Sequence, residues 1–311
     1  MGKLAFLLPG QGSQKVGMGA DVLADAPETL ERYFALAEEV SGKPIRQLCL
    51  EGPLEELTAT DVAQPALFCV ALAMAEIAFA EGLQPDFAAG HSLGEYTAAT
   101  VAGALAPEDG IRLVCARGAF MAAAQDEVPG GMAAIIGMDA DALAALCDSI
   151  DGRVTPANFN TPSQIVVSGD MDAVDALVEA APGAGAEKAI KLKVGAAFHS
   201  EAMVPVREKM AEQMAGVTFS DPAIPIVSNA SGQLVNSADE IREALLAQIS
   251  SPVRWVDCVN TLADNGVDTY LELGPGRVLI GLVRQIREGM DVTAADSPKK
   301  LSRFVEQHAT S

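Results

Sequence analysis

The chain has 311 residues, half of them apolar, and a formal net charge of −21 at pH 7. This length and apolar content exclude a disordered protein and predict one large domain, alone or with a smaller insert. The negative charge excludes nucleic acid or an anionic membrane as the main partner, because either needs a basic surface. The three histidines, His91, His199 and His308, have no metal-binding spacing, so we expect no zinc site.

The sequence also predicts where the protein works. The apolar segment 4–8 stops at Pro9-Gly10, too early for a signal peptide, and no apolar run is expected to be long enough to cross a bilayer. Scattered cysteines without a Cys-x-x-Cys pair are typical of reduced, structural thiols. We therefore expect a cytoplasmic protein. The five cysteines are Cys49, Cys69, Cys115, Cys147 and Cys258.

Strands and helices alternate in the first part of the chain. We predict a strand at 3–8, a helix at 65–81, a strand at 87–90, and helices at 93–105 and 107–124. The helix at 65–81 is apolar nearly all round, which indicates burial inside a layered α/β domain.

The middle of the chain has a different order. The pattern is strand, helix, strand, strand, helix, strand, which is typical of a ferredoxin-like unit. The predicted elements lie at 132–137, 139–149, 153–159, 164–168, 171–181 and 187–194. Because Pro129-Gly130-Gly131 interrupts the chain before them, we predict an inserted subdomain at 126–196 and a catalytic domain made of 1–125 and 197–311. Strands at 224–228 and 269–273 and a helix after Gly276 complete the catalytic domain.

A Gly-x-Ser-x-Gly motif, Gly90-His91-Ser92-Leu93-Gly94, lies between a predicted strand and a predicted helix. Chance gives on the order of 0.1 such matches in a chain of this length. One interpretation is an ordinary turn in which Ser92 caps the helix. The other is a serine nucleophile held at a strained turn, with the Leu93 N–H directed at a developing oxyanion.

A serine nucleophile needs a base, and His199 is the candidate. His91 is next to Ser92 on the same turn, and His308 lies in the polar C-terminal tail. His199 follows a strand and precedes a helix that Ser200 can cap. The alternative is a buried histidine bonded only to backbone groups.

Arg117 is centred on the apolar face of its predicted helix. A charge that points into the protein must meet an anion. The anion is either an internal carboxylate in a structural salt bridge or the carboxylate of a substrate, which a guanidinium grips bidentately.

Seven segments, in order along nearly the whole chain, resemble the malonyl-CoA:acyl carrier protein transacylases of bacterial type II fatty acid synthesis. They are PGQGSQ (9–14), QPAL (64–67), GHSLGEY (90–96), RG with FM (117–121), NFN (158–160), FHS (198–200) and ELGPG (272–276). The resemblance implies an α/β-hydrolase-like domain with a parallel sheet and a ferredoxin-like insert. It also implies transfer of a malonyl group from malonyl-CoA to acyl carrier protein, without a metal or redox cofactor.

The resemblance assigns the site residues as well. Ser92 would be the nucleophile, His199 the general base, and the N–H groups of Gln11 and Leu93 the oxyanion hole, while Arg117 would hold the malonyl carboxylate.

Two further residues follow from the same resemblance. A main-chain carbonyl near Gln248, ahead of Pro252-Val253-Arg254-Trp255, would orient the histidine, since the last carbonyls of a helix lack intrahelical partners. Phe198 would bind the acyl group, because Ala197-Phe198-His199 is similar to the malonyl-selective form of polyketide acyltransferase domains.

The mechanism that we expect is ping-pong through a malonyl-serine ester. Three alternatives stay open at this point. A serine esterase or thioesterase shares the Gly-x-Ser-x-Gly motif, a non-catalytic carrier-binding module would retain the fold, and a malonate decarboxylase transacylase subunit would have the same motifs.

Overall fold

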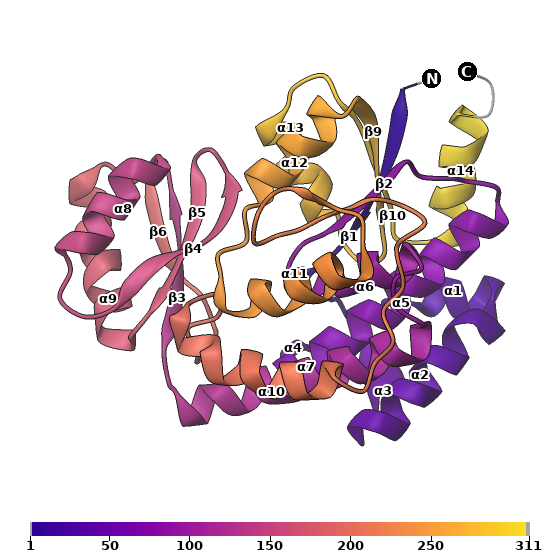
Figure 1. Ribbon diagram of the computed structural model, residues 1–311, viewed down its shortest axis with the longest axis horizontal. Coiled ribbons are helices and arrows are strands. Elements are labelled where there is room, and N and C mark those ends of the chain that lie inside the picture. The colour runs from indigo at the N-terminus through magenta and orange to yellow at the C-terminus, as the bar shows by residue number, and fades with distance from the viewer. Residues whose placement is uncertain (1, 309–311) are drawn as a thin grey trace.

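The computed structural model describes residues 2–308, which form a mixed α/β fold with two separate sheets (Figure 1). The strands of the first sheet are β1 (Lys3–Leu8), β2 (Phe87–Gly90), β7 (Ile226–Val227), β8 (Leu234–Val235), β9 (Val267–Leu273) and β10 (Asp291–Ala295). Their order is β10-β9-β1-β2-β7-β8, and every neighbouring pair is parallel except β7 and β8.

The central strand β1 is buried on both faces of the sheet. Ala5, Phe6, Leu7 and Leu8 are all fully buried, a continuous apolar run of the kind that parallel sheets require. The carboxyl ends of β1, β2 and β7 lie along one edge of the sheet, where ligands bind in open α/β folds.

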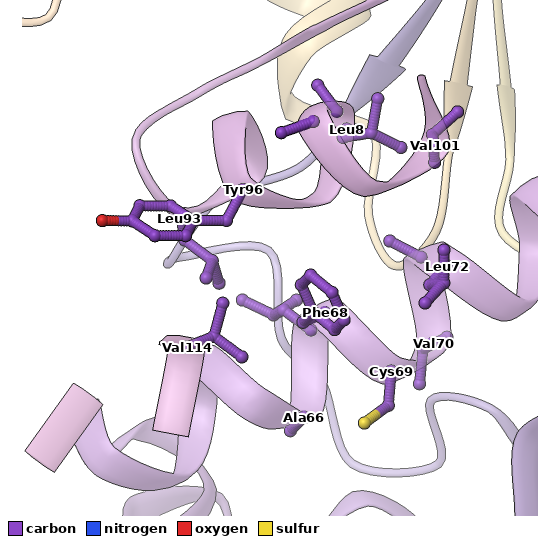
Figure 2. Close-up of a cluster of buried hydrophobic side chains, with 14 of the residues drawn as sticks. Leu8, Ala66, Phe68, Cys69, Val70, Leu72, Leu93, Tyr96, Val101 and Val114 are labelled. Carbon is purple, nitrogen blue, oxygen red and sulfur yellow. The ribbon is translucent and has the colours of Figure 1, made fainter. Parts of the chain in front are cut away.

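Helices surround the first sheet (Figure 1). They are α1 (Ala20–Asp25), α2 (Pro27–Ser41), α3 (Ile45–Glu51), α4 (Leu54–Thr58), α5 (Thr60–Ala80), α6 (Leu93–Val101), α7 (Pro107–Glu127), α10 (Val204–Met214), α11 (Ala238–Ser250), α12 (Trp255–Asp264), α13 (Val278–Ile286) and α14 (Pro298–His308). Figure 2 shows Phe68 of α5 beside Leu93 of α6 and Val114 of α7, all within the largest core cluster.

Helix α5 corrects two expectations. It begins at Thr60, with Pro65 inside it, and not at Pro65. By length and composition it is apolar enough to cross a membrane, so the expectation that no run reaches that length is wrong. However, 83% of its most apolar window is buried inside the protein, which is the environment of a core helix.

The second sheet is antiparallel throughout, in the order β4-β5-β3-β6. Its elements, in chain order, are β3 (Gly131–Ile136), α8 (Ala140–Ser149), β4 (Val154–Thr161), β5 (Gln164–Gly169), α9 (Met171–Ala180) and β6 (Lys188–Lys191). Short 3₁₀ turns lie at Ala181–Ala184 and Glu201–Met203.

The two faces of β3 belong to different cores. Ala133 and Ile135 pack with Leu143 of α8 and Val174 of α9, while Met132 and Ala134 belong to the large core cluster. This alternation is the period-two pattern of a strand. The second sheet therefore has its own core on one face and contacts the rest of the protein with the other.

The predicted strands at 3–8 and 87–90 have the observed bounds, whereas other ends differ. Helix α6 stops at Val101, four residues before the predicted end at 105, because Gly103 has a φ of 79° that a helix cannot accommodate. Helix α7 continues to Glu127. The strands predicted at 187–194 and 224–228 are shorter, at Lys188–Lys191 and Ile226–Val227.

Candidate active site

Ser92 lies in the turn between β2 and α6 and has a positive φ of 53°. Two glycines make this turn possible. A Cβ at Gly90 would lie 2.0 Å from the backbone of Gly94, and one at Gly94 would lie 2.1 Å from the carbonyl oxygen of Leu8. The Ser92 side chain makes no capping hydrogen bond to α6. The interpretation of Ser92 as a helix cap is therefore wrong.

His199 contacts Ser92, although the two residues are 107 positions apart in the sequence. Its Nε2 lies 2.8 Å from Ser92 Oγ, and its Nδ1 lies 2.7 Å from the carbonyl oxygen of Gln248. Because a carbonyl only accepts, Nδ1 carries the proton and Nε2 accepts from the Ser92 hydroxyl. The carbonyl belongs to the last turn of α11, where it has no intrahelical partner.

The surroundings keep His199 neutral. Burial, followed by the positive charge of Arg117, lowers the pKa of His199 to about 3. General-base catalysis requires a neutral imidazole whose unprotonated nitrogen accepts the proton of the nucleophile, and His199 Nε2 is placed to do so at Ser92.

Arg117 lies on α7, is 1% exposed and reaches into the same site. It donates hydrogen bonds to Gln64 Oε1 (2.7 Å), Gln248 Oε1 (2.8 Å) and Ser92 Oγ (3.1 Å). None of the ion pairs within residues 2–308 involves Arg117. Its direct partners are neutral, so the interpretation as an internal salt bridge is wrong, and the buried cation is available to an anion.

The side chain of Gln248 connects these groups. Its Nε2 donates to the Ser92 carbonyl over 2.8 Å and to Glu95 Oε2 over 3.1 Å. Glu95 is buried, and burial raises its pKa to about 8, even though Arg117 opposes the shift. Glu95 is therefore mostly protonated at neutral pH.

The two predicted oxyanion donors differ in their surroundings. The N–H groups of Gln11 and Leu93 donate no hydrogen bond within the part of the chain that the structure describes. Leu93 is the first residue of α6, where the helix dipole favours negative charge. Gln11 follows β1 and lines the same cavity as Ser92.

A cavity of about 360 Å³ contains the reactive side chains Ser92, His199 and Arg117. Apolar side chains form much of the rest of its wall. They are Met121, Met132, Val166, Leu192, Val194 and Phe198. Polar side chains, among them Asn160 and Lys193, complete the lining, and an apolar wall with polar groups placed along it is typical of a small-molecule site.

The other two histidines form hydrogen bonds with residues other than Ser92. His91 Nε2 lies 2.8 Å from Asn160 Oδ1, and His308 bonds Asp291 from within α14, not from a polar tail as predicted. Of the three histidines, the structure brings only His199 to the Ser92 hydroxyl among residues 2–308.

Sequence reasoning assigned no role to two buried amides of the site. Gln64 is fully buried and accepts from Arg117. Asn229 follows β7 and bonds the main chain on both sides of His91. A signal existed for each: Gln64 is a polar residue in an apolar helix, and Asn229 lies at the carboxyl end of a predicted strand.

The chain is similar to known proteins over nearly its whole length. Residues 5–303 match the acyl transferase domain family. The chain is 41% identical to the malonyl CoA-acyl carrier protein transacylase of Bacillus subtilis, over 98% of this chain and 97% of that protein. The corresponding protein of Escherichia coli K12 is 40% identical over 98% of this chain and 100% of its own length.

The chain is also similar to solved structures. The malonyl-CoA:acyl carrier protein transacylase of Xanthomonas oryzae superposes with a TM-score of 0.93 at 38% identity, covering 98% of each chain. A malonyl-transacylase in complex with a type II polyketide synthase acyl-carrier protein gives a TM-score of 0.94 at 38% identity, covering 98% of this chain and 100% of that one. The chain therefore belongs to the acyl transferase domain family and, within it, to the malonyl CoA-acyl carrier protein transacylases.

Proposed function

We propose that the protein transfers a malonyl group from malonyl-CoA to the phosphopantetheine thiol of acyl carrier protein. One observation carries the proposal: the Ser92 hydroxyl bonds a neutral His199 and a buried Arg117, which also donates to the neutral amides of Gln64 and Gln248. The names of the relatives agree with this activity, and one solved relative is bound to an acyl-carrier protein.

In the first half-reaction, Ser92 gives its proton to His199 Nε2 while Oγ attacks the thioester carbonyl. The tetrahedral oxyanion accepts hydrogen bonds from the N–H groups of Gln11 and Leu93. The carbon–sulfur bond then breaks, and His199 returns the proton to the sulfur of CoA. Malonyl-Ser92 and free CoA are the products.

The second half-reaction reverses these steps with a different thiol. The phosphopantetheine thiol gives its proton to His199, and its sulfur attacks the malonyl-Ser92 ester. When the tetrahedral intermediate collapses, the proton passes from His199 to Ser92 Oγ. The Gln248 carbonyl holds the His199 tautomer that both half-reactions need.

Two residues account for the choice of the malonyl group. Arg117 holds the malonyl carboxylate bidentately, in place of its present contacts with neutral groups. Phe198, which lines the cavity next to the base, limits the space around the second carbon of the acyl group.

We also propose the finer description of the fold. Residues 1–125 and 197–311 form an α/β-hydrolase-like catalytic domain, and 126–196 form a ferredoxin-like subdomain. The strand and helix order of β3 to β6 and the parallel order around β1 and β2 support this description.

The proposed reaction moves only protons and an acyl group between the named residues and two thiols, so no step calls on a metal or redox cofactor. We propose that the protein works in the cytoplasm and that neither nucleic acid nor a membrane is a partner. The net charge of −21 supports this part of the proposal.

Intact-mass analysis after mixing the protein with malonyl-CoA tests the proposed function. We expect a single malonyl adduct that disappears when acyl carrier protein is added, with malonyl-carrier protein as the product. Release of free malonate faster than transfer would favour an esterase or thioesterase instead. No adduct at all would favour a non-catalytic module. Preference for a malonate decarboxylase carrier would favour that enzyme's transacylase subunit.

A further inference from the structure

The turn that carries Ser92 is held by a side chain from the neighbouring strand. We propose that Asn229 is a positioning residue for the nucleophile, an inference that rests on the proposed role of Ser92. Asn229 lies two residues beyond the end of β7, the strand that pairs with β2. Its side chain is fully buried.

The two ends of the Asn229 amide bond the main chain on both sides of His91. Asn229 Oδ1 accepts from the Ser92 N–H over 2.6 Å, and Asn229 Nδ2 donates to the Gly90 carbonyl over 2.7 Å. Only a group with a donor and an acceptor at this separation satisfies both.

Asn229 is itself anchored by its backbone. Its carbonyl oxygen accepts from the Arg254 N–H over 2.8 Å. The main chain at Asn229 is thus bonded to that of Arg254, which fixes the residue whose side chain supports the turn.

The turn needs such a support. Ser92 adopts φ 53° and ψ −108°, a conformation that a residue with a side chain rarely takes unless its surroundings hold it there. If the turn relaxed, Ser92 Oγ would leave the hydrogen-bonding distance at which His199 and Arg117 now meet it.

Asn229 also bonds an amide of the turn that lies next to a proposed oxyanion donor. Its side chain occupies the Ser92 N–H, whereas the next N–H along the turn, that of Leu93, donates no hydrogen bond within residues 2–308. Asn229 therefore acts on both the nucleophile and the oxyanion hole through the main chain of the turn.

The test compares Asn229→Leu and Asn229→Asp with a stability control, Leu262→Ala. Leu262 is fully buried in the cluster that contains Val227 of β7, but it is not part of the turn. Three quantities are measured for each variant. They are the single-turnover rate at which malonyl-CoA forms the Ser92 adduct, the malonyl-CoA concentration that gives half the maximal rate, and the melting temperature. Misplacing a nucleophile by about 1 Å costs on the order of 10² in rate.

We expect both Asn229 variants to lose about 10²-fold in acylation rate, with the half-saturating concentration within about threefold of wild type. Leu262→Ala should lose stability but keep its rate. Folded Asn229→Leu with the wild-type rate would overturn the proposal. Failure of the wild type to form an adduct would overturn the proposed function instead.

Asn229→Asp gives a second, independent measurement, because a protonated carboxyl has the same donor and acceptor as the amide. The ionised carboxylate has no donor for the Gly90 carbonyl. We expect the ratio of variant to wild-type rate to recover at least tenfold as pH falls from about 8 to about 5. Division by the wild-type rate removes the shared titration of Glu95, His91 and His199. A ratio that does not change with pH would overturn the proposal even if Asn229→Leu does not fold.

Discussion

The Ser92 hydroxyl that lies 2.8 Å from His199 Nε2 also accepts a hydrogen bond from Arg117 over 3.1 Å. A cation at this distance stabilises the oxygen as it loses its proton. The same cation helps to hold the pKa of His199 below its usual range. The same buried arginine therefore stabilises the Ser92 oxygen and keeps His199 neutral.

Replacing Ser92 with Ala should abolish the malonyl adduct, because the hydroxyl is the proposed covalent acceptor. The fold should persist, since the Ser92 side chain does not cap α6. Intact mass and peptide mapping check the adduct, and circular dichroism checks the fold. An adduct that persists on the variant, or that maps to a cysteine such as Cys115, would contradict the mechanism.

The acid limb of the acylation rate should lie well below pH 6.5, because burial and Arg117 lower the pKa of His199 to about 3. Between pH 7 and pH 5 we expect the rate to change by less than about threefold. A histidine with an ordinary pKa would be mostly protonated at pH 5 and would lose more than about tenfold. The measurement is single-turnover acylation across this range, and a midpoint near pH 6.5 would contradict the assignment.

Stability should fall with rising pH because of Glu95, and Glu95→Gln should remove that fall. Burial raises the pKa of Glu95 from 4.5 to about 8, so between these values the folded state binds more protons than the unfolded state. The stabilisation is present below pH 4.5 and is lost as pH rises through 8, by at most about 5 kcal/mol.

The check is the difference in melting temperature, Glu95→Gln minus wild type, measured from pH 5 to pH 8. It should become more positive as pH rises, because Gln keeps the bond to the Gln248 amide but cannot ionise. Glu55→Gln, an exposed change on α4, serves as the control and should give a constant difference. A constant difference for Glu95→Gln as well would contradict the raised pKa of Glu95.

Local features of the site could be predicted from the sequence, whereas most contacts between distant segments could not. The exceptions are the contacts of His199 with Ser92 and with the Gln248 carbonyl, which followed from the shortage of other bases and from the family resemblance. The turn at Ser92 depends on Gly90 and Gly94, both within two residues, and the buried face of Arg117 follows from the spacing in one helix. In contrast, the partners of Arg117 come from 53 and 131 residues away. Without the fold, nothing local identifies Gln64 as one of them.

The same distinction explains the errors in the element boundaries. The expected start of α5 at Pro65 follows local propensity, since proline favours a first turn. In the fold, Thr60 to Gln64 are helical because Val62, Ala63 and Gln64 are buried in the core. Packing therefore overrides the proline signal.

Shortening Phe198 to Ser should admit methylmalonyl-CoA, because Phe198 lines the cavity beside the base. Added space in a pocket typically changes the preference between such substrates by about 1–3 kcal/mol. The measurement is the ratio of kcat/KM for methylmalonyl-CoA and malonyl-CoA. Phe120→Ser, a change on α7 outside this cavity, is the control and should leave the ratio unchanged. An unchanged ratio for Phe198→Ser would mean that Phe198 does not limit this part of the acyl site.

Replacing Arg117 with Ala should lower malonyl transfer far more than acetyl transfer. The malonyl carboxylate would lose its buried guanidinium partner, and breaking such a pair costs about 3–5 kcal/mol, a factor of at least about 10². Both thioesters should lose some rate, because Arg117 also bonds Ser92 Oγ. Acetyl-CoA lacks the carboxylate. The ratio of kcat/KM for malonyl-CoA to kcat/KM for acetyl-CoA therefore isolates the contact between Arg117 and the carboxylate. We expect this ratio to fall by about 10² to 10³ in Arg117→Ala and less in Arg117→Lys, which keeps the charge but not the bidentate geometry. A purely structural role for Arg117 predicts instead that the melting temperature drops and both thioesters fail in parallel, with the ratio unchanged.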